Sequence, residues 1–400
     1  MIAIYLAPVY LLLNLYILRW GYLWMGTCHS ILRTLGFRLI FAVIYVLLST
    51  SLLTGFLIKN PKSLHRMLKI TGNYFLGIFL YTLVIILLAD FGRILLKYVF
   101  HASWIHSRTA FTVTGAICAL LILLLSACGI FHAKYIKTTS YDVIINKTIP
   151  ERTSMKVVLL ADTHFGYNAG VLHARELVRK INKQKPDLVC IAGDIFDNEY
   201  DAIRNPEKLE KTLRGIKSTY GVYACWGNHD LNEEILAGFT FKHKDGDLSD
   251  IKDPRMKKFL EDSNIHILED ESVLINDQFY VIGRKDASLT EKIHETRKAP
   301  AQLTEKLDRD KPIIMIDHQP KELQELADAG VDLDLCGHTH NGQTFPGNFT
   351  IKLMWENPCG LLSKDNMTNI TTSGAGVWGP AMRIGTDSEI CSINIQLKKA

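Results

Sequence analysis

The chain has 400 residues, of which 48% are hydrophobic, and a formal net charge of +4. This charge is unevenly distributed, because residues 1–140 hold twelve of the 45 basic residues but only one acid, Asp90. The remainder carries 33 basic and 40 acidic residues, a net charge of −7. An acidic soluble part lacks the basic surface on which nucleic-acid binding depends, so we expect no nucleic-acid partner.

Four apolar stretches in the first third of the chain predict transmembrane helices at about residues 2–18, 36–58, 73–89 and 109–131. Each is close to the roughly 17 to 25 residues that cross a bilayer. A buried soluble bundle is the alternative, but helices that are apolar all round and flanked by Arg, Lys, Trp and Tyr favour a bilayer. The first stretch lacks the basic start and the small-residue cleavage site of a secretory signal. Residues 1–133 are therefore predicted to be a membrane region.

The basic residues near the ends of the spans indicate on which side of the membrane the rest of the chain lies. With four spans, six basic residues fall in the loops on one side and seven on the other, counted near the ends of the spans. This small difference favours a cytoplasmic domain in a multi-pass protein of the plasma (cell) membrane. The eight cysteines show no C-x-x-C spacing, so we interpret them as small core residues that suit a reducing compartment.

Residues 134–152 are polar and β-prone and are interpreted as a linker that merges into the first strand of a soluble domain, residues 153–400. Short apolar runs rich in β-branched residues then alternate with helical stretches at Val171–Gln184 and Pro320–Ala329. This alternation predicts an α/β domain with strands buried on both faces. The predicted strands are Val157–Ala161, Leu188–Ala192, Val222–Trp226, Ile313–Ile316 and Leu333–Cys336, and strand character also returns at 265–275 and 278–283. A charged stretch, Glu233–Asp262, is either a cap over an active site or a solvated surface insertion.

Metal-binding residue types follow the five strands directly. In open α/β sheets the carboxyl ends of the strands meet at the edge where ligands bind, so one edge receives all these groups. A single His after a strand is usually a hydrogen-bonded structural residue, but five segments with such residues in order predict a site. The candidates are Asp162, His164, Asp194, Asn228, His229, His318, His338 and His340.

The mixture of carboxylates, imidazoles and one amide, without a thiolate, suits divalent Mn, Fe or Zn. These ligands are too many for one ion, whereas two ions that share a carboxylate would use them all. Two ions about 3.5 to 4 Å apart stabilise the attacking and the leaving oxygen of an in-line displacement. Gly193, Gly227 and Gly337 precede the ligands and permit the sharp turns that such a site requires.

Five motifs occur in order between Lys156 and about Gln396: D-x-H, G-D-x-x-D, G-N-H-D, a lone His and G-H-x-H. In these motifs the chain resembles the calcineurin-like metallophosphoesterases. The resemblance implies a four-layer αββα sandwich and a bridging hydroxide as the nucleophile. It also implies that His229 is not a ligand but contacts the phosphate and protonates the leaving group. In the implied ligand sets, Asp162, His164 and His340 bind one metal, Asn228, His318 and His338 bind the other, and Asp194 bridges them.

Residues 317–320, 337–343 and 376–379 with Arg383 resemble the membrane-associated branch of this family, which includes UDP-2,3-diacylglucosamine pyrophosphatase-type enzymes. One departure is Asn341, where the branch leads us to expect Gly. Asp197 and Asp230 match family positions and are expected to orient neighbours rather than to bind metal. Trp378 and Arg383 either shape a substrate pocket or are a core residue and a surface residue.

The sequence therefore predicts a membrane-anchored, dinuclear-metal phosphohydrolase that cleaves a phosphodiester or pyrophosphate bond. Its expected substrate is a lipid-linked or nucleotide-linked phosphate, and its expected partners are membrane lipids. A non-catalytic metal-binding scaffold or sensor, and a phosphoprotein phosphatase, are the alternatives. The sequence does not define the substrate-binding residues, the native metals, the oligomeric state or a contribution of the membrane helices to the site.

Overall fold

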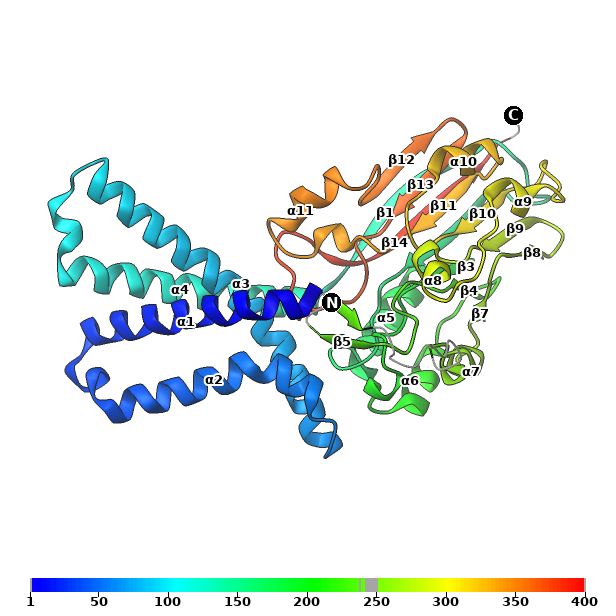
Figure 1. The fold of residues 1–400 in the computed structure, drawn as a ribbon. Helices are drawn as coiled ribbons and strands as arrows, with labels where there is room; N and C mark the ends of the chain where they lie inside the picture. Colours follow the sequence, from blue (N-terminus) through cyan, green and yellow to red (C-terminus); the bar gives the residue numbers. More distant parts are fainter. Residues whose placement is uncertain (1, 237–238, 242–250, 399–400) are drawn as a thin grey trace. The chain divides into compact units, whose positions relative to one another are not determined.

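The structure is a computed structural model that describes residues 2–236, 239–241 and 251–398, with the side chains of residues 2–6 and 239–241 left aside. It divides into two compact units (Figure 1). The first comprises residues 1–131, 235–241 and 379–382, and the second comprises residues 132–234, 242–378 and 383–400. Each unit is considered by itself.

Four long helices make up most of the first unit: α1 (Ile2–Cys28), α2 (Leu35–Leu57), α3 (Lys62–Tyr98) and α4 (Arg108–Ala133), which continues into the second unit. Among the described residues, α2, α3 and α4 are long and apolar enough to cross a membrane. The prediction of four spans is therefore corrected to three. In the described part of α1, Pro8, Asn14 and Arg19 interrupt the apolar sequence, and this helix is not among the candidate spans.

The interior of the helical unit is aromatic and contains polar groups. Trp20, Phe75 and Phe79 are buried there together with Ile17, Ile86 and Cys118. Asp90 on α3 accepts hydrogen bonds from the Tyr16 hydroxyl (2.7 Å) and from the Trp20 indole N–H (3.2 Å). A carboxylate in an apolar helix is costly to bury, and these donors on α1 offset part of that cost.

Two six-stranded sheets form the centre of the second unit. The first has the order β1-β14-β2-β3-β4-β7, with β14 antiparallel to β2 and the other neighbours parallel. The second has the order β12-β13-β11-β10-β9-β8, with antiparallel pairs at its two ends. The strands of the first sheet are β1 (Ile136–Ile145), β14 (Ser388–Leu397), β2 (Ser154–Leu160), β3 (Leu188–Ala192), β4 (Val222–Cys225) and β7 (His266–Ile267); those of the second are β12 (Gly360–Lys364), β13 (Met367–Thr371), β11 (Leu333–Cys336), β10 (Ile313–Ile316), β9 (Phe279–Gly283) and β8 (Glu271–Ile275).

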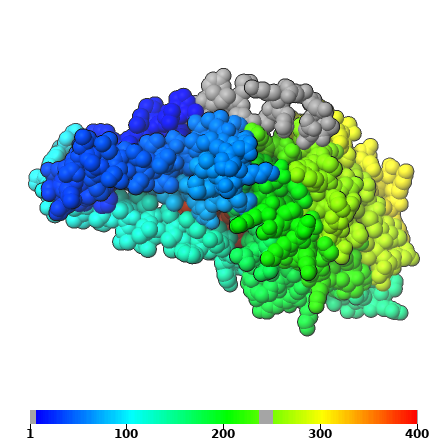
Figure 2. Space-filling view, turned by 90° about the horizontal axis from the view of Figure 1, so that it is seen from below, coloured from blue at the N-terminus to red at the C-terminus, as the bar shows by residue number. Residues whose placement is uncertain are grey.

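The alternation of side chains along the strands explains the layering. In β2, Val157 and Leu159 pack between the two sheets, while Val158 and Leu160 pack against helices on the outer face. These outer helices are α5 (Val171–Gln184), α6 (Pro206–Leu213) and α7 (Pro254–Asp262). Figure 2 views the molecule from the side of α6 and α7. On the second sheet, Ile313 and Met315 pack outward against α9 (Pro300–Thr304) and α10 (Leu323–Asp328). The order of layers is helix, sheet, sheet, helix.

Several predicted elements agree closely with the observed ones. The helix predicted at Val171–Gln184 has the bounds of α5, and three predicted strands have the bounds of β3, β10 and β11. Residues 134–152, predicted to be a linker, instead contain the ten-residue strand β1. The charged stretch 233–262 includes β5 (Glu234–Leu236), β6 (Phe239–Phe241) and α7, and its residues 237–238 and 242–250 lie outside the described part. Its prediction as a cap therefore stays a prediction.

Candidate metal centre

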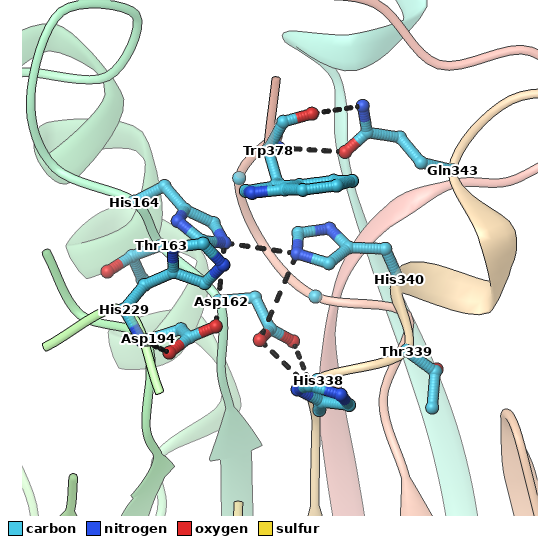
Figure 3. Close-up of polar contacts among 12 residues, drawn as sticks. Asp162, Thr163, His164, Asp194, His229, His338, Thr339, His340, Gln343 and Trp378 are labelled. Carbon is cyan, nitrogen blue, oxygen red and sulfur yellow. Dashed lines mark hydrogen bonds and ion pairs between the residues drawn. The ribbon is translucent and has the colours of Figure 1, made fainter. Parts of the chain in front are cut away.

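The predicted ligands follow the carboxyl ends of strands from both sheets. Asp162 and His164 follow β2, Asp194 follows β3, and Asn228 follows β4 in the first sheet. His318 follows β10, and His338 and His340 follow β11 in the second sheet. β2, β3 and β4 are parallel to one another, and so are β10 and β11. The loops that carry the ligands therefore meet at one edge (Figure 3).

One cluster consists of Asp162, His164 and His340, all buried, whose ligand atoms lie within 4.8 Å of one another. The Nε2 atoms of His164 and His340 are 3.0 Å apart, and His340 Nε2 is 3.9 Å from Asp162 Oδ1. The imidazole rings stack with their centroids 5.1 Å apart. Three donor atoms thus converge on one point between β2 and β11.

A second cluster consists of Asp194, His318 and His338, again with ligand atoms within 4.8 Å of one another. His318 Nε2 lies 3.2 Å from Asp194 Oδ2, 3.1 Å from His338 Nδ1 and 3.1 Å from Asn228 Oδ1. Asp194 Oδ2 is also 3.9 Å from His164 Nε2 in the first cluster. Asp194 therefore stands between the two clusters, where a bridging carboxylate is expected.

The backbone at these ligands is strained in a way that functional sites share. Left-handed φ angles occur at Asp162 (54°), His164 (44°), Asp194 (49°), His338 (72°) and His340 (48°). Non-glycine residues adopt this region at a cost, so the surrounding structure must hold them there. Strain at five of the predicted ligands indicates that the fold is organised around convergence of their side chains.

The close approach of the ligand loops also requires glycine. A Cβ at Gly227 would lie 2.2 Å from Asp194 Oδ1, and one at Gly337 would lie 2.7 Å from Asp162 Oδ2. Neither space accommodates a methyl group beside a carboxylate. Of the glycines singled out in the sequence, Gly193 additionally has a φ of +74°.

The residues present fit two divalent cations. Two pairs of ring nitrogens lie within hydrogen-bond distance, one between His164 and His340 and one between His318 and His338. Each pair can share at most one proton, so the remaining lone pairs can bind a cation. Separations of about 3 to 4 Å are those of atoms on a common ion at about 2 to 2.2 Å from each ligand. Burial alone would raise the pKa of Asp194, but His318, His229 and His164 hold that pKa well below its ordinary value, so the carboxylate is ionised.

Oxygen atoms behind two ligands orient their rings. His318 Nδ1 lies 2.8 Å from the carbonyl of Ala192 and donates to it, which leaves Nε2 with its lone pair toward the site. His164 Nδ1 is 3.6 Å from Asp197 Oδ1, slightly beyond hydrogen-bond distance, and has no other partner among the described residues. Asp197 is thus placed to orient His164, as its position in the G-D-x-x-D motif led us to expect.

His229 lies beside the clusters and differs from the ligands in its contacts. Its ring is 5.3 Å from that of His164, and its Nδ1 donates to the side-chain oxygen of Asn198. Burial lowers the pKa of His229 to about 4, although the nearby Asp194 carboxylate raises it. The main-chain N–H of His229 donates to Asp194 Oδ1 at 2.7 Å. The ring is therefore neutral near pH 7 and has its Nε2 available.

Asp230 joins two ligand-bearing loops. One of its carboxylate oxygens accepts from Phe196 N at 2.8 Å and the other accepts from Gly227 N at 2.7 Å. Asp317, which precedes His318, is paired instead with Arg284 (3.2 Å) and Arg297 (2.8 Å). Neither carboxylate is a member of a ligand cluster. Each instead holds a neighbouring loop in place through its hydrogen bonds or ion pairs, and we call such residues braces.

Arg383 is fully buried, so its interpretation as a surface residue is wrong. Its guanidinium donates to the carbonyls of Ser373 (2.6 Å) and Gly376 (2.8 Å), and to His340 Nδ1 at 3.1 Å. Because a guanidinium only donates, His340 Nδ1 is the acceptor in this contact.

Trp378 borders the site on its exposed side (Figure 3). Its main-chain N–H donates to the Gln343 side-chain oxygen and its carbonyl accepts from the Gln343 amide, both at 2.8 Å. The indole lies 5.9 Å from the His229 ring. Asn341, found where Gly was expected, has a φ of 49°, a conformation that Asn tolerates better than most side chains.

Sequence reasoning missed Asn198 and Gln343 as site residues. Asn198 follows the G-D-x-x-D motif directly, and Gln343 ends the run from Gly337, so proximity to a motif was the available signal. Their partners lie 31 and 35 residues away in the chain. Such pairings are not visible in periodicity or spacing.

A family model described as calcineurin-like phosphoesterase matches residues 155–342. This match covers the strands and loops that carry all seven predicted ligands. The chain contains a calcineurin-like phosphoesterase domain. The motifs from which the resemblance was inferred lie within the matched residues.

Several curated proteins are similar to this chain. An uncharacterized metallophosphoesterase from Campylobacter jejuni is 32% identical over 257 residues, which are 62% of this chain and 61% of that protein. A transmembrane protein with metallophosphoesterase domain from Bos taurus is 27% identical over 295 residues, covering 70% of this chain and 62% of that protein. UDP-2,3-diacylglucosamine pyrophosphatase LpxG from Chlamydia trachomatis is 23% identical over 293 residues, covering 62% of this chain and 86% of that protein. The chain thus spans about three fifths of the length of the first relatives it matches.

Proposed function

We propose that this protein is a membrane-anchored, dinuclear-metal phosphohydrolase that cleaves a phosphodiester or pyrophosphate bond. The observation that carries the proposal is the pair of buried ligand clusters, Asp162, His164 and His340 beside Asp194, His318 and His338. Asp194 approaches both clusters, and Asn228 completes the second. Two cations held at this edge would activate a water molecule for hydrolysis, so the site does not require a side-chain nucleophile with an adjacent base or a pair of catalytic carboxylates.

The seven ligands would hold two divalent cations, with Mn, Fe or Zn suited to the donor set. When bound, such ions supply Lewis-acid stabilisation of phosphoryl oxygens and an activated water at neutral pH. The protein residues hold the ligand atoms in place before substrate arrives, at the cost of the backbone strain described above. Trp378 and the buried ligand rings restrict bulk water on one side of the site.

His229 is the residue to which we assign proton transfer to the leaving oxygen. Its Nδ1 is fixed by Asn198, so Nε2 is the nitrogen that carries the transferred proton. Burial lowers the pKa of this ring in the free protein to about 4. An anionic phosphate beside the ring favours its charged form, so substrate binding itself promotes protonation. This coupling suits a general acid that is needed only when substrate is bound.

The substrate class that we propose is a phosphate ester or anhydride linked to a lipid or to a nucleotide. Three helices that can cross a membrane keep the domain close to lipids. The relative from Chlamydia trachomatis is named for a pyrophosphatase that acts on UDP-2,3-diacylglucosamine. A domain tethered to a bilayer meets amphiphilic molecules without a soluble carrier, and membrane lipids are therefore its proposed partners.

The helices α2 to α4, and the relative named as a transmembrane protein, indicate a membrane protein. We place it in the plasma membrane with its phosphoesterase domain on the cytoplasmic side. All eight cysteines are free, and four of the five in the second unit are buried, as in a reducing compartment. Protease protection of the domain in right-side-out vesicles tests this orientation, whereas cleavage in those vesicles contradicts it.

The activity test uses the full chain in detergent micelles, stripped of metal with a chelator and reloaded with Mn²⁺. Its substrates are a chromogenic phosphodiester, the matching phosphomonoester, a UDP-linked diacyl glycolipid and the same UDP-sugar without acyl chains. We expect metal-dependent cleavage of the diester and faster cleavage of the acylated than of the unacylated pyrophosphate. Faster turnover of the unacylated compound contradicts the lipid assignment but leaves the phosphohydrolase assignment intact.

Two variants separate the chemical roles. Asp194→Asn should lose metal and activity together, because it removes a charged ligand between the clusters. His229→Gln should retain metal but lose about 10²- to 10⁴-fold in kcat, the usual contribution of a general acid. A fully loaded wild-type protein without turnover on any phosphoester would instead support a scaffold or sensor, and turnover of phosphopeptides alone would support a protein phosphatase.

A further inference from the structure

The segment Thr344–Trp355, which we call the apolar loop, exposes large apolar side chains next to the metal centre. The exposed fractions of Phe345, Phe349, Leu353 and Met354 are 52%, 60%, 88% and 73%. The loop contains no acidic residue and one basic residue, Lys352. Apolar side chains concentrated in a short exposed segment are uncommon on soluble surfaces and typically mark contact with a partner or a membrane.

The apolar loop is an ordered part of the site. It contains α11 (Gly347–Thr350) and the 3₁₀ turn Ile351–Leu353, and it follows the ligand His340. At its start, Phe345 N donates to the carbonyl of Ile384 at 2.8 Å. At its end, the Trp355 ring packs edge-on against the ligand His338 with centroids 5.1 Å apart. Its exposed side chains are therefore held beside the ligands.

Strand register shows that the ligand edge is also the edge at which the chain leaves α4. Ile136 in β1 pairs with Ser388 in β14. Beyond the pair of Cys391 with Leu159, residues 374–376 lie between β14 and the end of β2, because Glu389 N donates to the carbonyl of Gly374 and Ala375 N donates to the carbonyl of Ala161. The carbonyl of Ala133, the last residue of α4, accepts from the Ser388 hydroxyl at 2.8 Å. Adjacent strands are about 4.8 Å apart, so the three spacings from the start of β1, through β14 and residues 374–376, to the end of β2 amount to about 14 Å.

α4 is a candidate membrane span, and only Lys134 and Tyr135 separate it from β1. Lys and Tyr are residue types that favour the interface between a bilayer and water. Chain connectivity from a candidate span to the ligand edge of the sheet favours a lipid surface, rather than a second copy of the chain, as the occupant of the apolar loop.

We infer that the apolar loop inserts Phe345, Phe349, Leu353 and Met354 into the interface of the membrane in which α4 is embedded. Lys352 then lies at the level of the lipid headgroups, where a basic side chain is favourable beside anionic lipids. The inserted loop holds the metal centre at the membrane surface, so a lipid headgroup reaches it without complete extraction of the acyl chains. The membrane contact itself holds for any substrate.

The test is a nitroxide spin label at residue 353 of the full chain, introduced as Leu353→Cys with the exposed Cys28 and Cys128 replaced by Ser and Ala. The protein is reconstituted into vesicles of phosphatidylcholine with a minor share of phosphatidylglycerol. Collision of the label with oxygen, which partitions into lipid, is compared with collision with a water-soluble nickel chelate. Asp310→Cys is the matched control, because residue 310 is exposed and precedes β10 at the edge opposite to His318.

We expect the ratio of oxygen to nickel accessibility to be several-fold higher at residue 353 than at residue 310, and residue 349 to behave like residue 353. Equal ratios at residues 353 and 310 would overturn the inference. So would a label at 353 that is shielded from both reagents, because that result identifies a protein partner or a second copy on the loop. The side chain of Leu353 is largely exposed, so its replacement leaves the fold intact, and the measurement does not depend on hydrolysis.

Discussion

Asp230→Asn tests whether the ligand loops are held by buried braces. In the structure the two Asp230 oxygens each accept a main-chain N–H, from Phe196 at 2.8 Å and from Gly227 at 2.7 Å. An Asn side chain retains one acceptor oxygen and turns an NH₂ group toward the other donor. Burial and the nearby Asp194 carboxylate raise the pKa of Asp230 to about 7, so the measurement is made at pH 8, where this side chain is charged. Hydrogen bonds to charged groups contribute about 1.5 to 3 kcal/mol, and a buried donor without a partner costs about 1 to 3 kcal/mol. We therefore expect the free energy of unfolding to fall by about 2 to 4 kcal/mol.

The same change should weaken metal binding, because Phe196 lies two residues after Asp194 and Gly227 immediately precedes Asn228. Loss of partners behind metal ligands typically lowers metal affinity by about 10- to 100-fold. Both quantities are measured on the full chain in micelles, by thermal unfolding of the metal-free protein and by competition for Mn²⁺ with a chromophoric chelator. Asp230 touches neither cluster directly in the described structure, so any effect on affinity acts through the loops.

Asp253→Asn is the matched control, since Asp253 caps α7 by accepting from Arg255 N at 2.9 Å. Asn caps helices about as well as Asp, and the ion pair with the half-exposed Arg255 guanidinium (2.6 Å) that it removes contributes about 1 kcal/mol at most, so this variant should lose no more than about 1 kcal/mol and leave Mn²⁺ affinity unchanged. If Asp230→Asn matches Asp253→Asn in both measurements, the brace interpretation is incorrect.

Two further predictions concern steric fit and pH. Gly227→Ala should abolish stable metal binding because its Cβ would lie 2.2 Å from Asp194 Oδ1, whereas Gly170→Ala, with no atom within 4 Å, should bind metal normally; equal metal contents would contradict this. Burial lowers the pKa of His173 to about 4 from 6.5. As the pH falls below 6.5, His173 takes up a proton in the unfolded chain before it does so in the folded chain. Protonation therefore favours the unfolded chain, and the free energy of unfolding falls as the pH falls from 6.5 toward 4. Between pH 8 and pH 5 the wild-type protein should lose about 2 kcal/mol more than His173→Gln in denaturation experiments; parallel pH profiles would refute the assignment.

The positions of the ligands could be predicted because the chemistry falls at strand ends. Asp162, Asp194 and His318 each follow an uninterrupted apolar run, and parallel strands in one sheet bring such positions to a common edge. This prediction required only the observation that each candidate directly follows an apolar run. When such runs are parallel strands, as they are here, the sequence is sufficient to group the candidates at one edge of the sheet.

The braces could not be predicted in this way, because they depend on which side chains meet after folding. From the sequence, Arg383 was interpreted as a possible surface residue. In the structure it is buried among carbonyl groups from residues 373–376 and lies beside His340. Asn198 gains its role from a His that lies 31 residues later. Their burial is offset by hydrogen bonds whose partners only the fold identifies.

Two local assignments were wrong or incomplete for physical reasons. β1 was predicted as part of a linker because only one of its faces is buried, and its pairing with β14 joins residues about 250 positions apart. The first predicted span is not among the candidate spans of the described residues. Asn14 and Arg19 interrupt its apolar sequence, and the Asn14 amide oxygen accepts from the Tyr45 hydroxyl at 2.8 Å within the helical unit.

The most direct test of the dinuclear site is the number of metal ions bound by the full chain. After chelation, reloading with Mn²⁺ and removal of free metal, the Mn content per chain is measured together with the electron paramagnetic resonance spectrum. Two bound ions that share Asp194 predict two Mn²⁺ per chain and the spectrum of an exchange-coupled pair, both lost in Asp194→Asn. A single isolated Mn²⁺ per chain in the wild-type protein, unchanged in Asp194→Asn, would contradict the two-metal account.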